Sequence, residues 1–392
     1  MIALALAAFL AQESLSSKEL AEAKDLATRY FAAKTWDEKA AIAAKLEAID
    51  HPSKGDIGSL TRHCLALIRR GPTVDPRGAV QKCTHPDFPG TFALSAPASA
   101  KSRPTGVFIG LHGRGGDGPG AQRAWGGASP DLIGVFPTVP DTAEAAGWNT
   151  ERAEQFVLAV LEDVKRSFVV DTNRVYLAGH SMGGFGTWSA GTHHADLFAA
   201  LSSGAGGNLV QNALPNLKNT PIWFYHSKDD NVVKADWDIE TAEQLAKLKA
   251  KHGPFDYVWK LYDDIGHGMP RDGVKPIVDW MAKKTRSPHP KHVLWEGTRA
   301  TKRFFFWLKR EKPGGSVEAK LDGNTIELAG STTGLEILLN DRVVKLGEPV
   351  VVKVDGQEKH NAKVKHSIVA LVESAAARTD EQMIYVARIK VP

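Results

Sequence analysis

The sequence predicts an α/β fold: a mostly parallel sheet covered by helices on both faces, with a small helical N-terminal region and a β-rich C-terminal domain. Three patterns carry this prediction. Residues 13–70 are rich in Ala, Leu, Lys and Glu, with apolar residues at helical spacing. Residues 89–286 alternate short β-type runs with helical ones, and the stretch after 286 alternates apolar and polar residues between turn signals. We therefore expect a helical region over 1–88, a central α/β domain over 89–286 and an accessory domain over 287–392.

Length and composition agree with a globular protein of more than one domain. The chain has 392 residues, of which 43% are hydrophobic and 24% charged, enough to bury a full core. The formal charge of +4 comes from 49 basic and 45 acidic residues spread along the chain. No basic stripe with interleaved aromatic residues indicates a nucleic-acid partner.

The first eleven residues are apolar but too short to span a bilayer, and no other segment approaches the roughly 20 apolar residues that a transmembrane helix needs. The stretch is either a short export signal, which would place the protein in the periplasm or outside the cell, or the start of a first helix in a cytoplasmic protein. It lacks a basic residue before the apolar run, so both alternatives stay open.

The two cysteines, Cys64 and Cys83, have no C-x-x-C spacing and cannot make a zinc site alone. A single disulfide and two thiols are both possible.

Within the central domain, short β-type runs are separated by helical stretches or turns. Helices are expected over 152–168 and 237–253, where apolar residues recur at helical spacing. Strands are expected at 90–97, 106–113, 132–139, 174–179, 197–206, 221–227 and 256–264.

The accessory domain contains one conspicuous aromatic run, "RFFFWLKR" at 303–310. It is either an aromatic binding face or a strand buried on both sides, since continuous apolar runs mark strands that are covered on both faces. Residues 366–378 are expected to form a single helix in this otherwise β-rich region.

A glycine-rich turn follows the predicted strand 174–179. It reads Gly179-His180-Ser181-Met182-Gly183 and leads into a plausible helix. This G-x-S-x-G pattern is typical of a nucleophile elbow, where small residues let strand and helix approach while the serine Oγ projects outward. Ser181 is therefore the candidate nucleophile.

A serine hydroxyl needs a base and an orienting carboxylate, and both follow later strands. Asp230 comes directly after the predicted strand 221–227, and His267 comes after the next one. Asp229 is a neighbouring alternative for the acid, and Asp264 a minor rival close to His267. The order serine, acid, histidine is the order of the α/β-hydrolase arrangement.

An oxyanion hole needs two backbone N–H groups near the serine. One candidate is the N–H of Met182, directly after the nucleophile. The other is the N–H of Arg114, in the glycine-rich turn 112–116 that ends an early strand.

The motifs "LHGRGG", "RVYLAGHSMGGFGTW", "HSKDDNVV" and "GHG" together resemble the α/β-hydrolase superfamily, over about residues 90–286. More closely, they are similar to its esterase and predicted-peptidase branch, near the feruloyl esterase, polyhydroxybutyrate depolymerase-like and carboxylesterase groups. In those relatives the acid lies in a pattern H-G-x-x-D-x-x-V, which places it on Asp230, although Ser227 stands where the glycine is usual. The resemblance implies an α/β-hydrolase fold and a serine esterase acting through an acyl-enzyme. A serine peptidase of the prolyl-oligopeptidase kind is one alternative, and a silent hydrolase scaffold with a binding C-terminal domain is the other.

Further residues are candidates for contact with substrate. Trp148, His112 and His180 flank the predicted turns and either line the substrate cleft or pack within them. His193 and His194 end a helix, but no carboxylate at ligand spacing accompanies them, so we assign no metal and no cofactor.

The expected partner is a small-molecule or polymer-borne ester, with possible carbohydrate contact through the C-terminal domain. Only a short connection separates the runs 197–206 and 221–227, which leaves no room there for a large lid. We expect an open cleft suited to an ester on a bulky chain, unless the N-terminal helices cover it.

Overall fold

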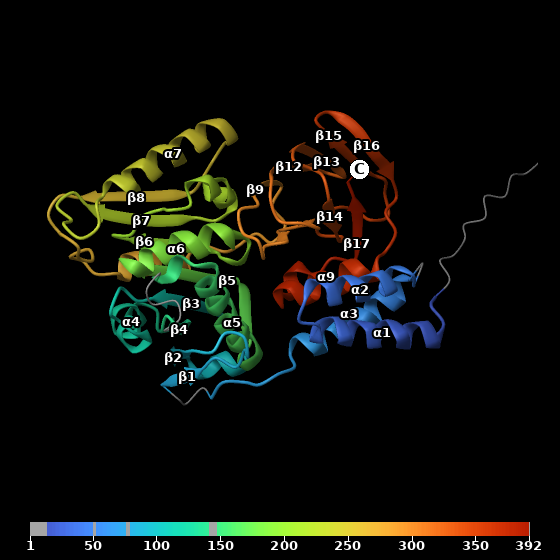
Figure 1. Cartoon of the computed structure of the whole chain (residues 1–392), viewed down its shortest axis with the longest axis horizontal. Coiled ribbons are helices and arrows are strands. Elements are labelled where there is room, and N and C mark those ends of the chain that lie inside the picture. The colour runs from blue at the N-terminus through green and yellow to red at the C-terminus, as the bar shows by residue number, and fades with distance from the viewer. Residues whose placement is uncertain (1–13, 50–51, 76–78, 141–146, 392) are drawn as a thin grey trace, which may run out of the picture.

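The central sheet has eight strands in the order β1-β2-β4-β3-β5-β6-β7-β8 (Figure 1). Its first strand lies at 80–82, so the sheet begins before the boundary expected at residue 89. The computed structural model describes residues 14–49, 52–75, 79–140 and 147–391. From β4 to β8 neighbouring strands run parallel, whereas β2 pairs antiparallel with both β1 and β4. The strands are β1 Val80–Lys82, β2 Thr91–Ser95, β3 Thr105–Leu111, β4 Ile133–Pro137, β5 Val170–His180, β6 Ala200–Gly204, β7 Ile222–Ser227 and β8 Tyr257–Tyr262.

Helices cover both faces of this sheet, because alternate residues of each strand point to opposite sides. On β5, Val175 and Leu177 join the core formed with α5, α6 and α7, and Tyr176 and Ala178 join the core formed with α4 and α8. The predicted mostly parallel sheet between two helical layers is thus confirmed. These helices are α4 Gly118–Trp125, α5 Glu151–Ser167, α6 Met182–His193, α7 Asp236–His252 and α8 Lys275–Ala282; short 3-10 helices are η1 Ala98–Lys101, η2 Gly126–Ala128, η4 Gly147–Asn149, η5 Ala195–Leu197 and η6 Gln211–Asn219.

The C-terminal region holds two further sheets and one helix, as the alternating pattern predicts. One sheet has the order β10-β11-β14-β17 and the other β16-β15-β13-β12-β9. The elements are β9 His292–Glu296, β10 Phe304–Phe305, β11 Leu308–Arg310, β12 Ser316–Asp322, β13 Thr325–Gly330, β14 Leu335–Leu339, β15 Val350–Val354, β16 Gln357–Ala362, α9 Ile368–Arg378, η7 Glu381–Met383 and β17 Ala387–Lys390.

The aromatic run 303–310 is not a binding face. Phe304 is 6% exposed and the four residues after it are fully buried, so none of these rings presents a surface to a ligand. The run is not one continuous strand either: β10 and β11 pair antiparallel, and the chain reverses at Phe306, whose φ is +49°. Burial was predicted correctly, while the tight hairpin was not.

Three N-terminal helices, α1 Ser17–Ala32, α2 Trp36–Glu47 and α3 Lys54–Ile68, each begin with a capping box. Their apolar faces form one core with α9, which includes Leu60 and Leu371. The three helices lie beside α9 (Figure 1). The three helices therefore pack on the C-terminal region. Because their apolar faces are buried against α9, these faces are not available to cover the central sheet.

Two smaller expectations can be compared with the structure. Cys64 and Cys83 are both free thiols, and burial raises the pKa of Cys64 to about 12. Among the described helices none is long and apolar enough to cross a membrane. The apolar stretch 1–11, with its possible export signal, lies outside the described residues.

Candidate active site

The parallel strands bring three predicted side chains to one edge of the central sheet. Ser181 directly follows β5, Asp230 lies just beyond β7, and His267 lies beyond β8. Because these strands are parallel, their carboxyl ends meet at the same edge, where crevices form in open α/β sheets.

The three side chains form an uninterrupted chain of hydrogen bonds. Asp230 Oδ2 lies 2.7 Å from His267 Nδ1, and His267 Nε2 lies 2.8 Å from Ser181 Oγ. A carboxylate only accepts, so Nδ1 carries the proton and donates it to Asp230. Nε2 of the neutral ring is then the acceptor for the Ser181 hydroxyl, the geometry that removes a proton from a nucleophile.

Ser181 sits in a strained turn that its glycine neighbours make possible. Its φ is +58°, a value that costs a non-glycine residue roughly 1–3 kcal/mol. A Cβ on Gly179 would lie 2.2 Å from the carbonyl oxygen of Gly183, and a Cβ on Gly183 would lie 2.4 Å from that of Leu111. Both positions of the G-x-S-x-G pattern therefore exclude side chains, which is the structural reason for the motif.

Asp230 and its neighbour Asp229 have separate partners. The second oxygen of Asp230, Oδ1, accepts from the backbone N–H groups of Val232 and Val233 at 2.8 and 2.9 Å. Burial alone would raise the pKa of Asp230, but the bond with His267 and these two amides lower it below its ordinary value.

Asp229 is exposed and braces the loop that carries His267. Its Oδ1 accepts from the Ser227 hydroxyl at 2.5 Å and from the Gly266 N–H at 2.9 Å. Asp264, the minor rival, pairs with Arg271 at the surface. The structure thus places Asp230, and neither neighbour, on the imidazole.

A second histidine, His226, stands behind Asp230 and was noted in the sequence only as part of the acid motif. Its Nε2 donates to the Val233 carbonyl at 2.9 Å, and its Nδ1 lies 2.8 Å from Asp238 Oδ2. Burial opposes a charge on the ring, but the bond with Asp238 raises the pKa of His226, while burial raises the pKa of Asp238 itself. His226 Nε2 also lies 3.2 Å from Asp230 Oδ2, so the ring contacts the carboxylate that holds His267.

His180 contacts the backbone of His267 and the side chain of Tyr225. Its Nε2 donates to the carbonyl oxygen of His267 at 3.1 Å, and its Nδ1 accepts from the Tyr225 hydroxyl at 3.1 Å. Burial lowers the pKa of His180 to about 4, so the ring stays neutral near pH 7. Its two nitrogens are occupied by protein groups, which favours a positioning role over the predicted contact with substrate.

Trp148 and His112 are also packed inside the turns, contrary to the prediction that they contact substrate. Trp148 is 1% exposed and donates from Nε1 to the His112 carbonyl at 3.0 Å. His112 donates from Nδ1 to the Gly113 carbonyl at 2.7 Å and accepts at Nε2 from the Val139 N–H at 3.0 Å. These groups fix the glycine-rich turn after β3, and their burial leaves no surface for a ligand.

That turn lies directly against the serine. A Cβ on Gly113 would lie 3.6 Å from Ser181 Cβ, and the next residue, Arg114, is exposed. Met182 is the first residue of α6, and the backbone N–H groups of a helix's first turn have no partner within the helix. The assignment of the Met182 and Arg114 amides to an oxyanion hole stays a prediction.

Sequence reasoning missed a partly exposed aromatic pair on the same sheet edge. Phe185, one turn into α6 after Ser181, meets Trp237 of α7 edge to face, with ring centroids 5.6 Å apart. Both rings rest on Gly207, and Trp237 remains 43% exposed. Only helical spacing from Ser181 could have indicated Phe185, and no pattern linked it with Trp237.

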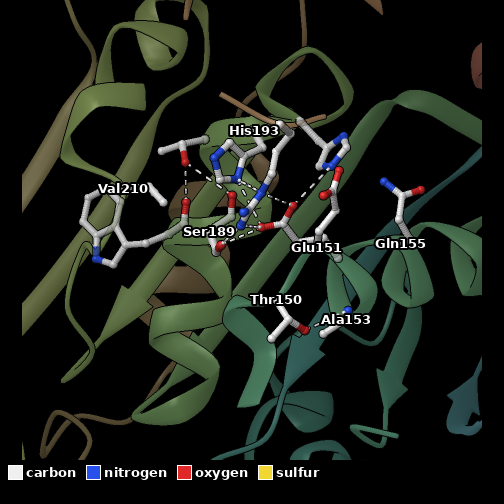
Figure 2. A network of polar contacts seen from close by, with 12 residues as sticks. Thr150, Glu151, Ala153, Gln155, Ser189, His193 and Val210 are labelled. Atoms are coloured by element: carbon white, nitrogen blue, oxygen red, sulfur yellow. Dashed lines mark hydrogen bonds and ion pairs between the residues drawn. The ribbon is translucent and has the colours of Figure 1, made fainter. Parts of the chain in front are cut away.

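His193 and His194 do meet a carboxylate, but one that comes from another helix (Figure 2). Glu154 of α5 is fully buried and lies 3.1 Å from His193 Nδ1 and 2.5 Å from Ser189 Oγ. Arg299 of the C-terminal region donates to both of its oxygens, at 2.6 and 3.1 Å. Because a guanidinium already satisfies this carboxylate, the cluster is an ion-pair network that joins the C-terminal region to α5 and α6.

We predict that Arg299→Ala destabilises the protein by about 3 kcal/mol, because removal of one partner leaves a buried charge poorly compensated. Burial alone would raise the pKa of Glu154, yet its histidine partners and Arg299 hold it well below its usual range. Equilibrium denaturation in urea measures the loss. Arg271→Ala, which removes the exposed pair with Asp264, is the matched control and should change stability little. An equal effect of both substitutions would contradict the prediction.

The segment of the chain that contains Ser181 is similar to known proteins. Residues 143–213 match the prolyl oligopeptidase family. Over 79 residues the chain is 35% identical to a bifunctional acetylxylan esterase/xylanase of Neocallimastix patriciarum, a match that spans 20% of this chain and 12% of that protein's length.

Solved structures that align with this chain include two esterase-type hydrolases. A thermostable esterase is 25% identical and covers 53% of this chain and 63% of its own, with a TM-score of 0.43. An S-formylglutathione hydrolase of Staphylococcus aureus is 17% identical and covers 54% of this chain and all of its own, with a TM-score of 0.42.

Proposed function

We propose that this member of the α/β-hydrolase superfamily is a serine esterase that cleaves carboxylic esters through an acyl-enzyme. The observation that carries the proposal is the hydrogen-bonded chain from Asp230 through His267 to Ser181, with the serine held at a strained turn. A silent scaffold would have no need of this arrangement, since strain in a backbone is retained where function uses it.

In the proposed reaction Ser181 Oγ attacks the ester carbonyl carbon while His267 Nε2 takes the hydroxyl proton. The carbonyl oxygen becomes an oxyanion, which the N–H groups of Met182 and Arg114 stabilise. His267 returns its proton to the departing alcohol, leaving Ser181 acylated. A water molecule then repeats the sequence: it loses a proton to His267, attacks the acyl carbon, and the acid leaves as the proton returns to Ser181.

Asp230 and the groups behind it hold the base in its working state. Asp230 fixes the proton of His267 on Nδ1 and offsets the positive charge that the ring gains during the reaction. The amides of Val232 and Val233 favour the ionised form of Asp230, and His180 holds the His267 backbone.

An ester on a bulky or aromatic group is the proposed substrate class. The connection between β6 and β7 holds only the short helix η6, which packs against β9 of the C-terminal region, so this connection, which the structure describes in full, places no large insertion over Ser181. The partly buried ring of Phe185, one helical turn from the serine, and the exposed ring of Trp237 together offer an aromatic surface. The matched relative is named as an acetylxylan esterase, whose ester is borne on a polysaccharide, which supports a polymer-borne ester here.

We predict that Trp237→Ala lowers kcat/KM for cinnamoyl or naphthoyl esters by about 2- to 12-fold, and kcat/KM for acetyl esters much less. An aromatic contact contributes roughly 0.5–1.5 kcal/mol beyond its area, which corresponds to this factor. Trp36→Ala removes another exposed tryptophan, on α2, and should leave both rates unchanged. Equal losses with both ester classes would assign Trp237 a structural role.

A peptidase is the second candidate, because the matched family is that of prolyl oligopeptidase and the match includes Ser181. Esters need less help with the leaving group than amides do, so one panel of acetyl, feruloyl, polymeric and prolyl-peptide substrates separates the two. Turnover of esters alone supports the esterase; faster turnover of the peptides would replace it by a peptidase.

A further inference from the structure

Away from the serine, three side chains of metal-ligand type meet where the central domain touches the C-terminal five-stranded sheet. His252 ends α7 of the central domain, His292 begins β9, and Glu318 lies on the neighbouring strand β12. All three are partly buried, with side chains 12%, 22% and 25% exposed, so the cluster is sheltered and still reachable from solvent.

The strand register explains why two of these residues face the same way. On β12 the residues Val317, Ala319 and Leu321 are buried in the core, so Glu318 and Lys320 project from the opposite face. His292 is paired directly with Lys320 across the ladder, which puts it diagonally next to Glu318. The C-terminal end of α7 brings His252 to the same face.

The distances among the ligand atoms are close to those that a metal requires. Glu318 Oε1 lies 2.8 Å from His292 Nε2 and 3.5 Å from His252 Nδ1, and the three candidate ligand atoms all fall within 4.8 Å of one another. Zinc bonds of about 2.0–2.2 Å in tetrahedral geometry place ligand atoms roughly 3.3 Å apart. Small side-chain rotations would meet that spacing.

The Glu318 carboxylate also forms an ion pair with a lysine. Lys320 Nζ lies 2.9 Å from the same Oε1 of Glu318, from a side chain that is 56% exposed. The flexible ammonium of Lys320 can move into solvent when a metal ion binds to Glu318. Until it moves, Lys320 competes with the metal ion for the carboxylate.

We propose that His252, His292 and Glu318 form a binding site for a divalent cation of the zinc class, which ties α7 to the C-terminal sheet. Two imidazole nitrogens and one carboxylate oxygen suit this borderline metal, with a water molecule as the fourth ligand. The site is independent of the proposed esterase activity. Its effect would be to stabilise the junction between the two parts, since a ligand that binds only the folded state raises its stability.

Metal binding by the full chain tests the proposal most simply. After treatment with a chelator, Zn²⁺ is titrated by calorimetry at pH 7.5, and Co²⁺ is added separately for its visible absorption. We expect one equivalent of Zn²⁺ per chain, an intense tetrahedral Co²⁺ spectrum, and a rise in Tm of several degrees with Zn²⁺. His292→Ala and Glu318→Gln should each weaken binding by tenfold or more, while His360→Ala, which removes another histidine of the same sheet, should not.

The Lys320→Met variant distinguishes a metal site from a cluster that is held together only by hydrogen bonds. Removing the competing ammonium should tighten Zn²⁺ binding several-fold, whereas a cluster held together by Lys320 would only lose stability. Hydrolysis of p-nitrophenyl acetate, in which none of these residues takes part, confirms that each variant is folded. The proposal is overturned if the wild type binds no Zn²⁺, or if His292→Ala, Glu318→Gln and Lys320→Met all bind it as the wild type does, which would mark an adventitious ion only.

Discussion

Ser181→Ala should reduce kcat for p-nitrophenyl butyrate by about 10⁴- to 10⁶-fold, because no other group can form the acyl-enzyme. What remains would come from binding and from the oxyanion donors, which act without the serine hydroxyl. The substitution removes one oxygen atom and keeps the backbone bond from the Ser181 N–H to the Gly204 carbonyl, so the turn should stay folded. Nitrophenol release, followed at several enzyme concentrations, measures the effect.

Two controls make this result interpretable. Ser189→Ala removes a serine of the same helix whose hydroxyl bonds to Glu154, and it should keep esterase activity while losing some stability. Thermal denaturation shows whether each variant is folded. If wild type and Ser181→Ala release nitrophenol at the same low rate, the serine esterase account fails.

Asp230→Asn should lower kcat by roughly 10⁴-fold, the second large effect that the geometry predicts. An asparagine amide in place of Oδ2 donates instead of accepting, so His267 would place its proton on Nε2 and could no longer take one from Ser181. The variant would also lose the negative charge that offsets the protonated ring. Both effects act on kcat, and steady-state kinetics with wild type and variant in parallel measures them.

Asp229→Asn is the matched control. Its amide oxygen can still accept from the Ser227 hydroxyl and the Gly266 N–H, so the loop of His267 should keep its position and kcat should change little. Asp229→Ala removes both bonds and should cost more than the asparagine variant. A large loss with Asp229→Asn and a small one with Asp230→Asn would move the acid by one residue.

The sequence was sufficient to predict the central sheet and the meeting of Ser181, Asp230 and His267, because both follow from local patterns. Alternating β and helical runs predict parallel strands, and parallel strands bring their carboxyl-end loops to one edge. The glycines could be predicted as well, since a tight turn of strand into helix excludes side chains at Gly179 and Gly183. In each case the residues that determine the structure lie within one short stretch of the chain.

Roles that depend on distant partners could not be predicted. The pKa of His226 is raised by its bond with Asp238, twelve residues away on α7, and His193 and His194 contact the carboxylate of Glu154, on the preceding helix α5. Whether an aromatic side chain is buried or exposed depends in the same way on which distant segment packs against it. Trp148 turned out buried under the turn after β3, while Trp237 is exposed, although neither stretch of sequence distinguishes the two.

We expect Ser181 to be the one activated serine of the chain. Reaction with a fluorophosphonate, followed by intact mass and peptide mapping, tests it most directly, since the reagent needs the nucleophile and its base but no knowledge of the natural ester. We predict one phosphonyl group per chain, attached to Ser181, formed far more slowly in a His267→Ala variant and absent in Ser181→Ala. No labelling of the folded wild type, or labelling of a different serine, would contradict the account.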